Sequence, residues 1–383
     1  MRLDDMGSRY DLVLKELKKA SQKDHHFREG RILGSMCTEP LDIAKNAHSI
    51  FLEANLGNPG LYPGTAELEG ELIEMVSEML HGQNVSGLTV SGGTEANITS
   101  LWIAKKISKK TEVLYPKSAH HSILKAADIL GLNAVEVGLT EKFQMDVSEM
   151  EGKLTKNTAA VVGIAGTTEF GVIDPIEELG NLCNDTFLHV DAAFGGFVIP
   201  FLVDLGHDMP NFDFVVENVD SISTDPHKMG LASIPSGILL LRSEDYLKKI
   251  AVSSPYLTSP RQASLSGTRC SAGAVSAWAA MKFLGREGYK KVVKECMDTT
   301  NYIVSRVRDL GFEIAMEPQL NIVCINMKDA DSVFSELSKL GWKASVTRSP
   351  KCLRIVVMPH VTKKVVDEFI PDLEKVCKEL QEI

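Results

Sequence analysis

The strongest chemical signal in this sequence is a lysine flanked by a proline, a histidine and a glycine. Lys228 lies in the segment STDPHKMG (223–230), directly after an apolar run. Most lysines are solvated surface groups. A lysine held in a cleft by such neighbours can lose its proton through burial, and the neutral amine can attack an aldehyde. The segment therefore predicts a nucleophilic amine at position 228, with a solvated loop lysine as the simpler alternative.

A second segment, HVDAAFGG (189–196), places an aspartate at the end of a predicted buried strand. In open α/β sheets, ligand sites gather at this end of the strands. The carboxylate of Asp191 could pair with a protonated ring nitrogen and keep that ring electron-poor. Ala193 is small enough for a flat ring to lie against it. A plain N-cap for the next helix is an equally good interpretation of Asp191.

Two further segments suit a phosphate group and a planar ring. In SGGTEAN (91–97), Gly93 and Thr94 stand where a strand passes into a helix, and free N–H groups at a helix start bind anions. A simple Ser/Thr-x-x-Glu helix start would look the same. In SAHHSILK (118–125), a histidine could stack on a ring, although single histidines are more often structural. The histidine pair has no third ligand at suitable spacing, so no metal site is expected.

The hydrophobic pattern indicates the fold that must position these segments. Apolar strand runs alternate with helical runs from about residue 66 to 242, which predicts a mainly parallel sheet with helices on both faces. Residues 28–65, rich in Gly, Pro and Asn, predict an extended arm, and GREG (285–288) predicts a hinge. After Gly311, short strands are expected at EIAM, NIVCINM, KASV and LRIVVMP. The main predicted helices are 9–22, 66–80, 94–107, 120–130, 271–309, 330–340 and 362–382.

Composition narrows the class of protein. The 383 residues carry a net charge of −10, which argues against nucleic-acid binding because phosphate backbones attract basic surfaces. Seven scattered cysteines, an odd number, indicate free thiols in a reducing cytoplasm. The charged N-terminal segment has no apolar core of a signal peptide, and no run of about 18 apolar residues predicts a membrane span. We therefore expect a cytoplasmic protein.

Taken together, the four segments resemble the group II amino-acid decarboxylases that depend on pyridoxal 5′-phosphate (PLP). Further segments are similar to the archaeal L-tyrosine/L-aspartate decarboxylases: GRILGSMCTEP (30–40), LGNPGLYPGT (56–65), SLSGTR (264–269) and LRIVVMPHVT (353–362). The resemblance runs from about residue 28 to the C-terminus. It implies the aspartate aminotransferase fold (fold type I), with a mainly parallel seven-stranded sheet in the large domain and a small α+β C-terminal domain. We expect residues 1–55 to form an N-terminal helix and arm, 56–285 the large domain and 286–383 the small one.

The resemblance also implies an activity. The chain would be a PLP-dependent carboxy-lyase that converts L-tyrosine to tyramine for methanofuran, or L-aspartate to β-alanine for coenzyme A. The active sites would be shared between the two subunits of a homodimer.

Roles for single residues follow from the same resemblance. Lys228 would form the Schiff base, Asp191 would pair with the pyridine nitrogen, and His120 rather than His121 would stack on the ring. The remaining cofactor shell would consist of Gly93, Thr94, Thr168, Ala193 and His227, with Gly267 and Thr268 reaching the phosphate of the neighbouring subunit. The segment GTRCS (267–271) departs from the more usual GTRSG, which leaves the geometry of that loop open.

Two further residues are candidates for the chemistry. Tyr256, in SSPYL (253–257), is expected to return a proton to the substrate, because the family carries a mobile loop with a catalytic tyrosine at this place. Arg354 is expected to grip a substrate carboxylate by bidentate pairing. A packing tyrosine and a structural salt bridge are the alternatives.

Three other functions remain open. A cysteine desulfurase or lyase of the same fold would need a loop cysteine; Cys324 lies in an apolar strand run, whereas Cys352 looks loop-like. An aminotransferase would form a keto acid instead of an amine. A doubly wound nucleotide-binding protein without enzymatic activity would form no covalent adduct.

Overall fold

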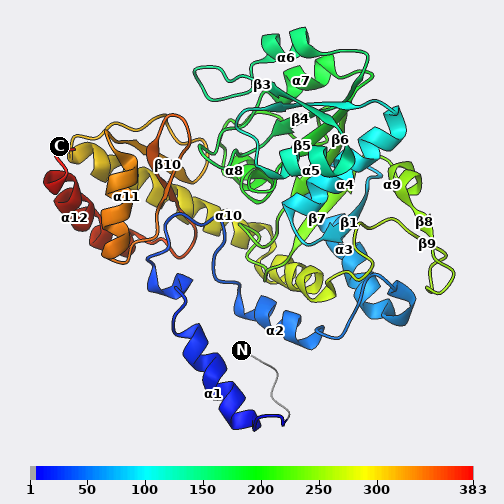
Figure 1. Ribbon diagram of the computed structural model, residues 1–383, viewed down its shortest axis with the longest axis horizontal. Helices are drawn as coiled ribbons and strands as arrows, with labels where there is room; N and C mark the ends of the chain where they lie inside the picture. Colours follow the sequence, from blue (N-terminus) through cyan, green and yellow to red (C-terminus); the bar gives the residue numbers. More distant parts are fainter. Residues whose placement is uncertain (1–5, 383) are drawn as a thin grey trace.

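A seven-stranded sheet forms the centre of the computed structural model, which describes residues 6–382 (Figure 1). The strand order is β1-β7-β6-β5-β4-β2-β3. Only β7 runs antiparallel to its neighbours; the other pairs in the sheet are parallel. The mainly parallel α/β sheet expected from the sequence is confirmed. The strands are β1 (Ser86–Val90), β2 (Glu112–Pro116), β3 (Asn133–Val137), β4 (Thr158–Ile164), β5 (Phe187–Asp191), β6 (Val219–Thr224) and β7 (Gly237–Leu241).

Helices cover both faces of this sheet, as the apolar strands require. Every residue of β4 is buried, and neighbouring residues face opposite sides. Val161 belongs to the core under one layer of helices, and Val162 belongs to the core under α4 and α5. Parallel strands buried on both faces therefore read as continuous apolar runs, which explains why their positions were predictable. The helices are α3 (Pro63–Met79), α4 (Gly93–Ser108), α5 (Ser122–Leu130), α6 (Val147–Lys153), α7 (Ile176–Leu182), α8 (Ile199–Asp204) and α9 (Asp245–Ile250).

The C-terminal part forms a smaller α+β unit on a second, three-stranded sheet of order β10-β12-β11. It is reached through α10 (Ser271–Asp309), which has a non-helical residue at Gly285, with φ 57° and ψ −174°. That kink falls within the segment for which a hinge was expected. The remaining elements are β10 (Ile322–Asn326), α11 (Ala330–Lys339), β11 (Ser345–Val346), β12 (Cys352–Val356) and α12 (Lys363–Glu379).

The N-terminal part differs from the expected extended arm. Helix α1 (Tyr10–Ser21) buries none of its residues, and Figure 1 shows it apart from both sheets. Helix α2 (Asp42–Ile50) interrupts the arm, because Ala47 packs against Val275 and Ala279 of α10. The expected strand EIAM is wrong, since only Ile314 forms an isolated bridge there, to Ile325. A short hairpin of β8 (Val252–Ser253) and β9 (Arg261–Gln262) was not foreseen. Within residues 6–382, no helix is both long enough and apolar enough to cross a membrane.

Candidate active site

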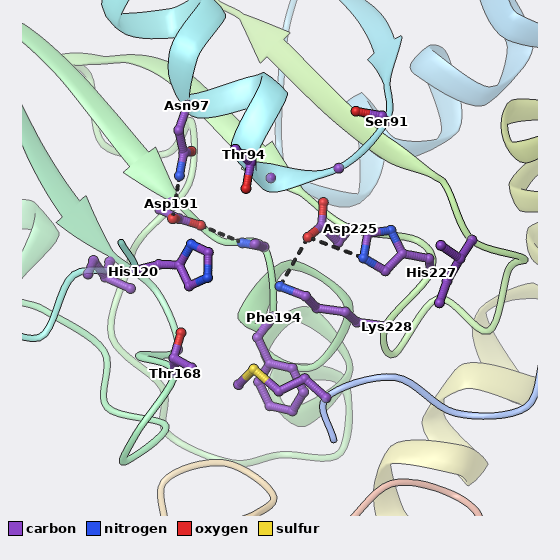
Figure 2. Close-up of a pocket in the computed structure, with 17 residues that line it drawn as sticks. Ser91, Thr94, Asn97, His120, Thr168, Asp191, Phe194, Asp225, His227 and Lys228 are labelled. Atoms are coloured by element: carbon purple, nitrogen blue, oxygen red, sulfur yellow. Dashed lines mark hydrogen bonds and ion pairs between the residues drawn. The ribbon is translucent and has the colours of Figure 1, made fainter. Parts of the chain in front are cut away.

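A cavity of about 420 Å³ lies at the carboxyl ends of the parallel strands (Figure 2). Sites of open α/β sheets form at this edge because loops from several strands converge there. Eight of the residues expected in the site line the cavity: Gly93, Thr94, His120, Thr168, Asp191, Ala193, His227 and Lys228. They follow five different strands, so the sheet assembles segments that are up to 135 residues apart (228 − 93).

Lys228 is held by a carboxylate that sequence reasoning overlooked. Its Nζ lies 3.0 Å from Oδ2 of Asp225, and Asp225 is buried. Burial by itself lowers the pKa of Lys228, but Asp225 and then Asp191 outweigh it, so the pKa is raised above its ordinary value. The expectation that burial would deprotonate the amine is therefore wrong for the chain alone. The signal was present in the sequence, because Asp225 stands three residues before Lys228 in the same motif.

Asp191 ends β5 and points into the cavity, where it accepts several hydrogen bonds. Asn97 Nδ2 donates to Oδ2 at 2.8 Å, and the backbone N–H of Ala193 donates to Oδ1 at 3.1 Å. The hydroxyl of Ser223 also lies 3.3 Å from Oδ1. These contacts fix the orientation of the carboxylate. Asp191 can therefore face a ring nitrogen of a ligand in the cavity. It is not the N-cap of a regular helix, because the next element is the short 3₁₀ turn Gly195–Phe197.

Figure 2 shows the imidazole ring of His120 and the amine of Lys228 pointing into the same cavity. The ring of His121 contacts that of His120 at a tilt of 46°, with ring centroids 3.8 Å apart, and His121 lies outside the cavity lining. Burial, followed by the neighbouring His121, lowers the pKa of His120. The ring is therefore neutral near pH 7 and can pack on a flat ligand without the cost of a buried charge. Thr168, on the loop after β4, lines the same cavity.

The turn between β1 and α4 forms a cradle for an anion. Gly93 begins α4, a helix of 16 residues whose first N–H groups have no partner within the helix. Strand β7, which begins at Gly237, packs directly against this turn. A Cβ atom added at Gly237 would lie 2.5 Å from Cα of Gly92. The cavity thus offers an amine, a carboxylate, an imidazole face and an anion cradle. These groups fit PLP, which carries an aldehyde, a ring nitrogen, a flat ring and a phosphate.

Four expected site residues lie outside the cavity of their own chain. Tyr256 is 83% exposed in the turn between β8 and β9. Gly267 and Thr268 are exposed in the loop before α10. Arg354 is buried in the middle of β12, away from the cavity lining. Residues of the cavity that sequence reasoning missed are Met36, Ser91, Gly92, Asn97, Ile164, Gly166, Phe194, Asp225 and Ile234.

The guanidinium of Arg354 has N–H groups that lack a hydrogen-bond partner. Nη1 donates to the carbonyl oxygen of Gly34 and to the hydroxyl of Ser345, each at 3.0 Å, but Nε and Nη2 are buried without a partner. Burial lowers the pKa of Arg354 to about 10. The structural salt bridge considered above does not occur among residues 6–382. Gly34 lies two residues before Met36 of the cavity lining, so Arg354 is hydrogen-bonded to the segment that supplies Met36.

The two cysteines considered for a persulfide carrier, Cys324 and Cys352, are both buried. Cys352 is fully buried at the start of β12, so the expectation that it lies in a loop is wrong. Burial raises the pKa of Cys352 and that of Cys324, which keeps both thiols protonated and unreactive. Cys270, the departure from the usual loop sequence, is exposed immediately before α10. In the described part of the chain, no three His, Cys, Asp or Glu side chains are grouped to hold a metal ion.

Comparison with known proteins agrees with this geometry. The family model described as "Pyridoxal-dependent decarboxylase conserved domain" matches residues 54–328. A probable L-aspartate decarboxylase of Archaeoglobus fulgidus is 45% identical over 371 residues, covering 96% of this chain and 99% of the relative. A probable L-tyrosine/L-aspartate decarboxylase of Methanothermobacter thermautotrophicus is 45% identical over 354 residues, covering 91% and 98%. The sphingosine-1-phosphate lyase structure from Burkholderia pseudomallei superposes with a TM-score of 0.91 at 25% identity, covering 99% and 92%.

The ion pair between Asp225 and Lys228 predicts how the amine reacts. Asp225→Asn removes the charge that raises the pKa of Lys228 and leaves the burial that lowers it. In the protein without bound ligand, Lys228 should therefore be acetylated severalfold faster than in the wild type near about pH 8, as mass spectrometry of the peptide would measure, because only the neutral amine reacts. The exposed Lys142 serves as the reference within each sample. Equal rates at Lys228 in both proteins would contradict the assignment.

Proposed function

Because this chain belongs to the family of pyridoxal-dependent decarboxylases, we propose that it removes the α-carboxylate of L-aspartate, of L-tyrosine, or of both. When bound, PLP supplies an electron sink for the bond that breaks at Cα. The observation that carries the proposal is the cavity in which Lys228, Asp191 and His120 converge beside the glycine cradle. The products would be CO₂ with β-alanine or tyramine, and their use in coenzyme A or methanofuran synthesis is part of the proposal.

Each residue of the cavity has a separate task in this proposal. Lys228 holds the cofactor covalently, and Asp225, 3.0 Å away, pairs with the amine and orients it. Asp191 keeps the ring nitrogen protonated, and its attraction is strong because the site is buried. His120 covers one face of the ring. Gly93, Thr94 and His227 hold the phosphate, while Thr168 and Ala193 border the ring.

Arg354 is the proposed partner of a substrate carboxylate. A buried guanidinium with unpaired N–H groups is costly unless an anion or acceptor satisfies it. A carboxylate that reached Nε and Nη2 would be gripped in the bidentate geometry that arginine favours. The apolar side chains of Met36, Phe194 and Ile234 in the cavity lining would suit the ring of tyrosine equally well. Both candidate substrates therefore stay within the proposal.

We also propose a homodimer whose active sites are completed across the interface. Tyr256, Gly267 and Thr268 lie on exposed segments outside their own chain's cavity, as expected if they serve the partner's site. Helix α1 exposes Tyr10, Leu12, Val13, Leu14 and Leu17, an apolar set that a second subunit could cover. A cytoplasmic location is supported by the cysteines, all seven of which are free thiols.

The reaction itself is tested with purified protein. Incubation with L-aspartate or L-tyrosine should release CO₂ and the matching amine, and borohydride should fix the cofactor to Lys228, as peptide mass spectrometry would detect. Lys228→Ala should lower the rate roughly a thousandfold or more, because the covalent attachment is lost. Lys125→Ala, an exposed lysine on α5, is the control and should retain full activity. A keto-acid product, or an adduct on another lysine, would contradict the proposal.

The role of Arg354 predicts a change in substrate affinity. Arg354→Met should raise KM roughly ten- to a hundredfold, because charge-assisted hydrogen bonds contribute about 1.5–3 kcal/mol each. The matched control is Arg348→Met, since Arg348 is exposed and already paired with Glu169. Steady-state kinetics with each substrate provides the measurement. If KM stays unchanged in Arg354→Met while the protein remains folded, the arginine does not grip the substrate.

The shared active site is tested by mixing inactive subunits. Tyr256→Phe and Lys228→Ala should each be inactive as homodimers. When both chains are co-expressed with different tags, mixed dimers form, and in each of these one site receives an intact lysine and an intact tyrosine. The mixed population should recover about a quarter of the wild-type activity, from half the dimers with one working site each.

The control for this experiment mixes Lys228→Ala with His120→Gln. Both residues line the cavity of one chain, so no mixed dimer contains an intact site and no activity should return. Recovery in the control, or none in the tyrosine pair, would argue against a site completed by the partner. Full activity of Tyr256→Phe alone would remove the tyrosine from the mechanism.

A further inference from the structure

A row of buried polar side chains connects Asp191 with His120. Nδ2 of Asn97, on α4, lies 2.8 Å from Oδ2 of Asp191 and 2.9 Å from Oγ of Ser122. Oγ of Ser122, the first residue of α5, lies 2.9 Å from Nδ1 of His120. Asn97 and Ser122 are almost completely buried, at 1% and 0% exposure. Water therefore does not compete for these hydrogen bonds, and their directions depend on the side chains alone.

The amide of Asn97 can take only one orientation. Its nitrogen faces the carboxylate of Asp191, which accepts hydrogen bonds and does not donate them. Its oxygen then accepts from Nε2 of His189 at 2.9 Å and from the hydroxyl of Ser223 at 3.1 Å. All four hydrogen-bonding positions of the amide are thereby used. The second N–H of Asn97 must donate to Ser122.

The donor and the acceptor can also be assigned in the contact between Ser122 and His120. Oγ of Ser122 accepts from Asn97 and lies 2.9 Å from Nδ1 of His120, so its own proton is free to point to Nδ1. The backbone N–H of Ser122 also lies 3.3 Å from Nδ1, and an N–H group can only donate. Two donors thus converge on Nδ1, which must carry a lone pair.

A neutral imidazole has a single ring proton, so the proton of His120 lies on Nε2. Within residues 6–382, Nε2 has no hydrogen-bond partner, and the ring lines the cavity. His120 thus has one free donor and no free acceptor. This polarity suits a carboxylate or phenolate oxygen and is unsuitable for removing a proton from a ligand.

We propose that Asn97 and Ser122 are positioning residues that hold His120 in the Nε2–H tautomer. The same amide of Asn97 also restrains the carboxylate of Asp191, so one side chain orients two of the residues that line the cavity. The tautomer follows from the hydrogen bonds alone. Its use, to donate toward an anionic group of the substrate, rests on the proposed function.

The tautomer can be observed directly. Full-length, cofactor-loaded protein would be labelled with ¹⁵N at the ring nitrogens of its ten histidines, and solid-state NMR would report which nitrogen carries a proton. His120→Gln identifies the signals of His120. We expect an unprotonated Nδ1 and a protonated Nε2 near neutral pH. A proton on Nδ1 would overturn the proposal without the need for any variant.

A matched pair of serine variants tests the role of Ser122. Ser122→Ala removes a donor that stabilises the neutral ring, so the pKa of His120, read from the same signals, should rise by roughly 0.4–1 unit. Ser118→Ala is the control, because its Oγ is equally buried, stands two residues before His120 and has no hydrogen-bond partner. Equal shifts in the two variants would assign the effect to packing and overturn the role of the hydroxyl.

Asn97→Ala, alone and combined with Ser122→Ala, tests whether the amide acts through the serine. If it does, the two shifts in the pKa of His120 are less than additive. Simple additivity would remove Asn97 from the proposal. None of these measurements depends on turnover, so failure of the decarboxylase assay would leave the tautomer result intact. Conversely, the wrong tautomer would leave the decarboxylase proposal standing.

Discussion

Burial of polar groups at one edge of the sheet is the constraint on which the site depends. The parallel strands end together, and the charged side chains that follow them have little access to water. A buried charge is stable only when it is paired or hydrogen-bonded. Lys228 and Asp225 satisfy this by pairing, and Asp191 by accepting hydrogen bonds from Asn97 and its neighbours. The geometry of the chemistry is therefore set by the need to satisfy these groups.

Much of the site could be predicted because its residues occur in short local motifs. Asp191 ends strand β5, and Gly93 and Lys228 come within four residues of the ends of β1 and β6; the carboxyl end of a parallel strand is where ligands bind. The partners of these residues could not be predicted in the same way. Asn97 meets Asp191 across 94 positions and Ser122 across 25 positions of the chain, and such pairs depend on how α4 packs beside α5 and β5. No local pattern encodes that packing.

The same contrast holds for the fold: elements marked by a local sequence pattern were predicted, whereas elements that depend on packing between distant segments were not. Strand β4 and helix α10 lie where they were expected, because a buried apolar run and a long amphipathic run are both local signals. Helix α2 was missed, since its small alanines become a core only when α10 covers them. The protonation of Lys228 was misjudged for a related reason. Burial could be foreseen from the sequence, whereas the balance between burial and a carboxylate at 3.0 Å needs the structure.

Some buried polar groups of the described residues have no hydrogen-bond partner, and one of them, Oδ1 of Asp225, belongs to the cavity lining. Buried polar atoms without a partner include Oδ1 of Asp225, Oγ1 of Thr224, and Nε and Nη2 of Arg354. Folded proteins satisfy most of their buried polar groups, so each exception costs free energy that packing elsewhere must offset. Such a cost is recovered when a ligand provides the missing partner, because a ligand that binds only the folded chain adds to its stability. Asp225 is the member of this set that lines the cavity, so a ligand that satisfied its free oxygen would recover part of that cost.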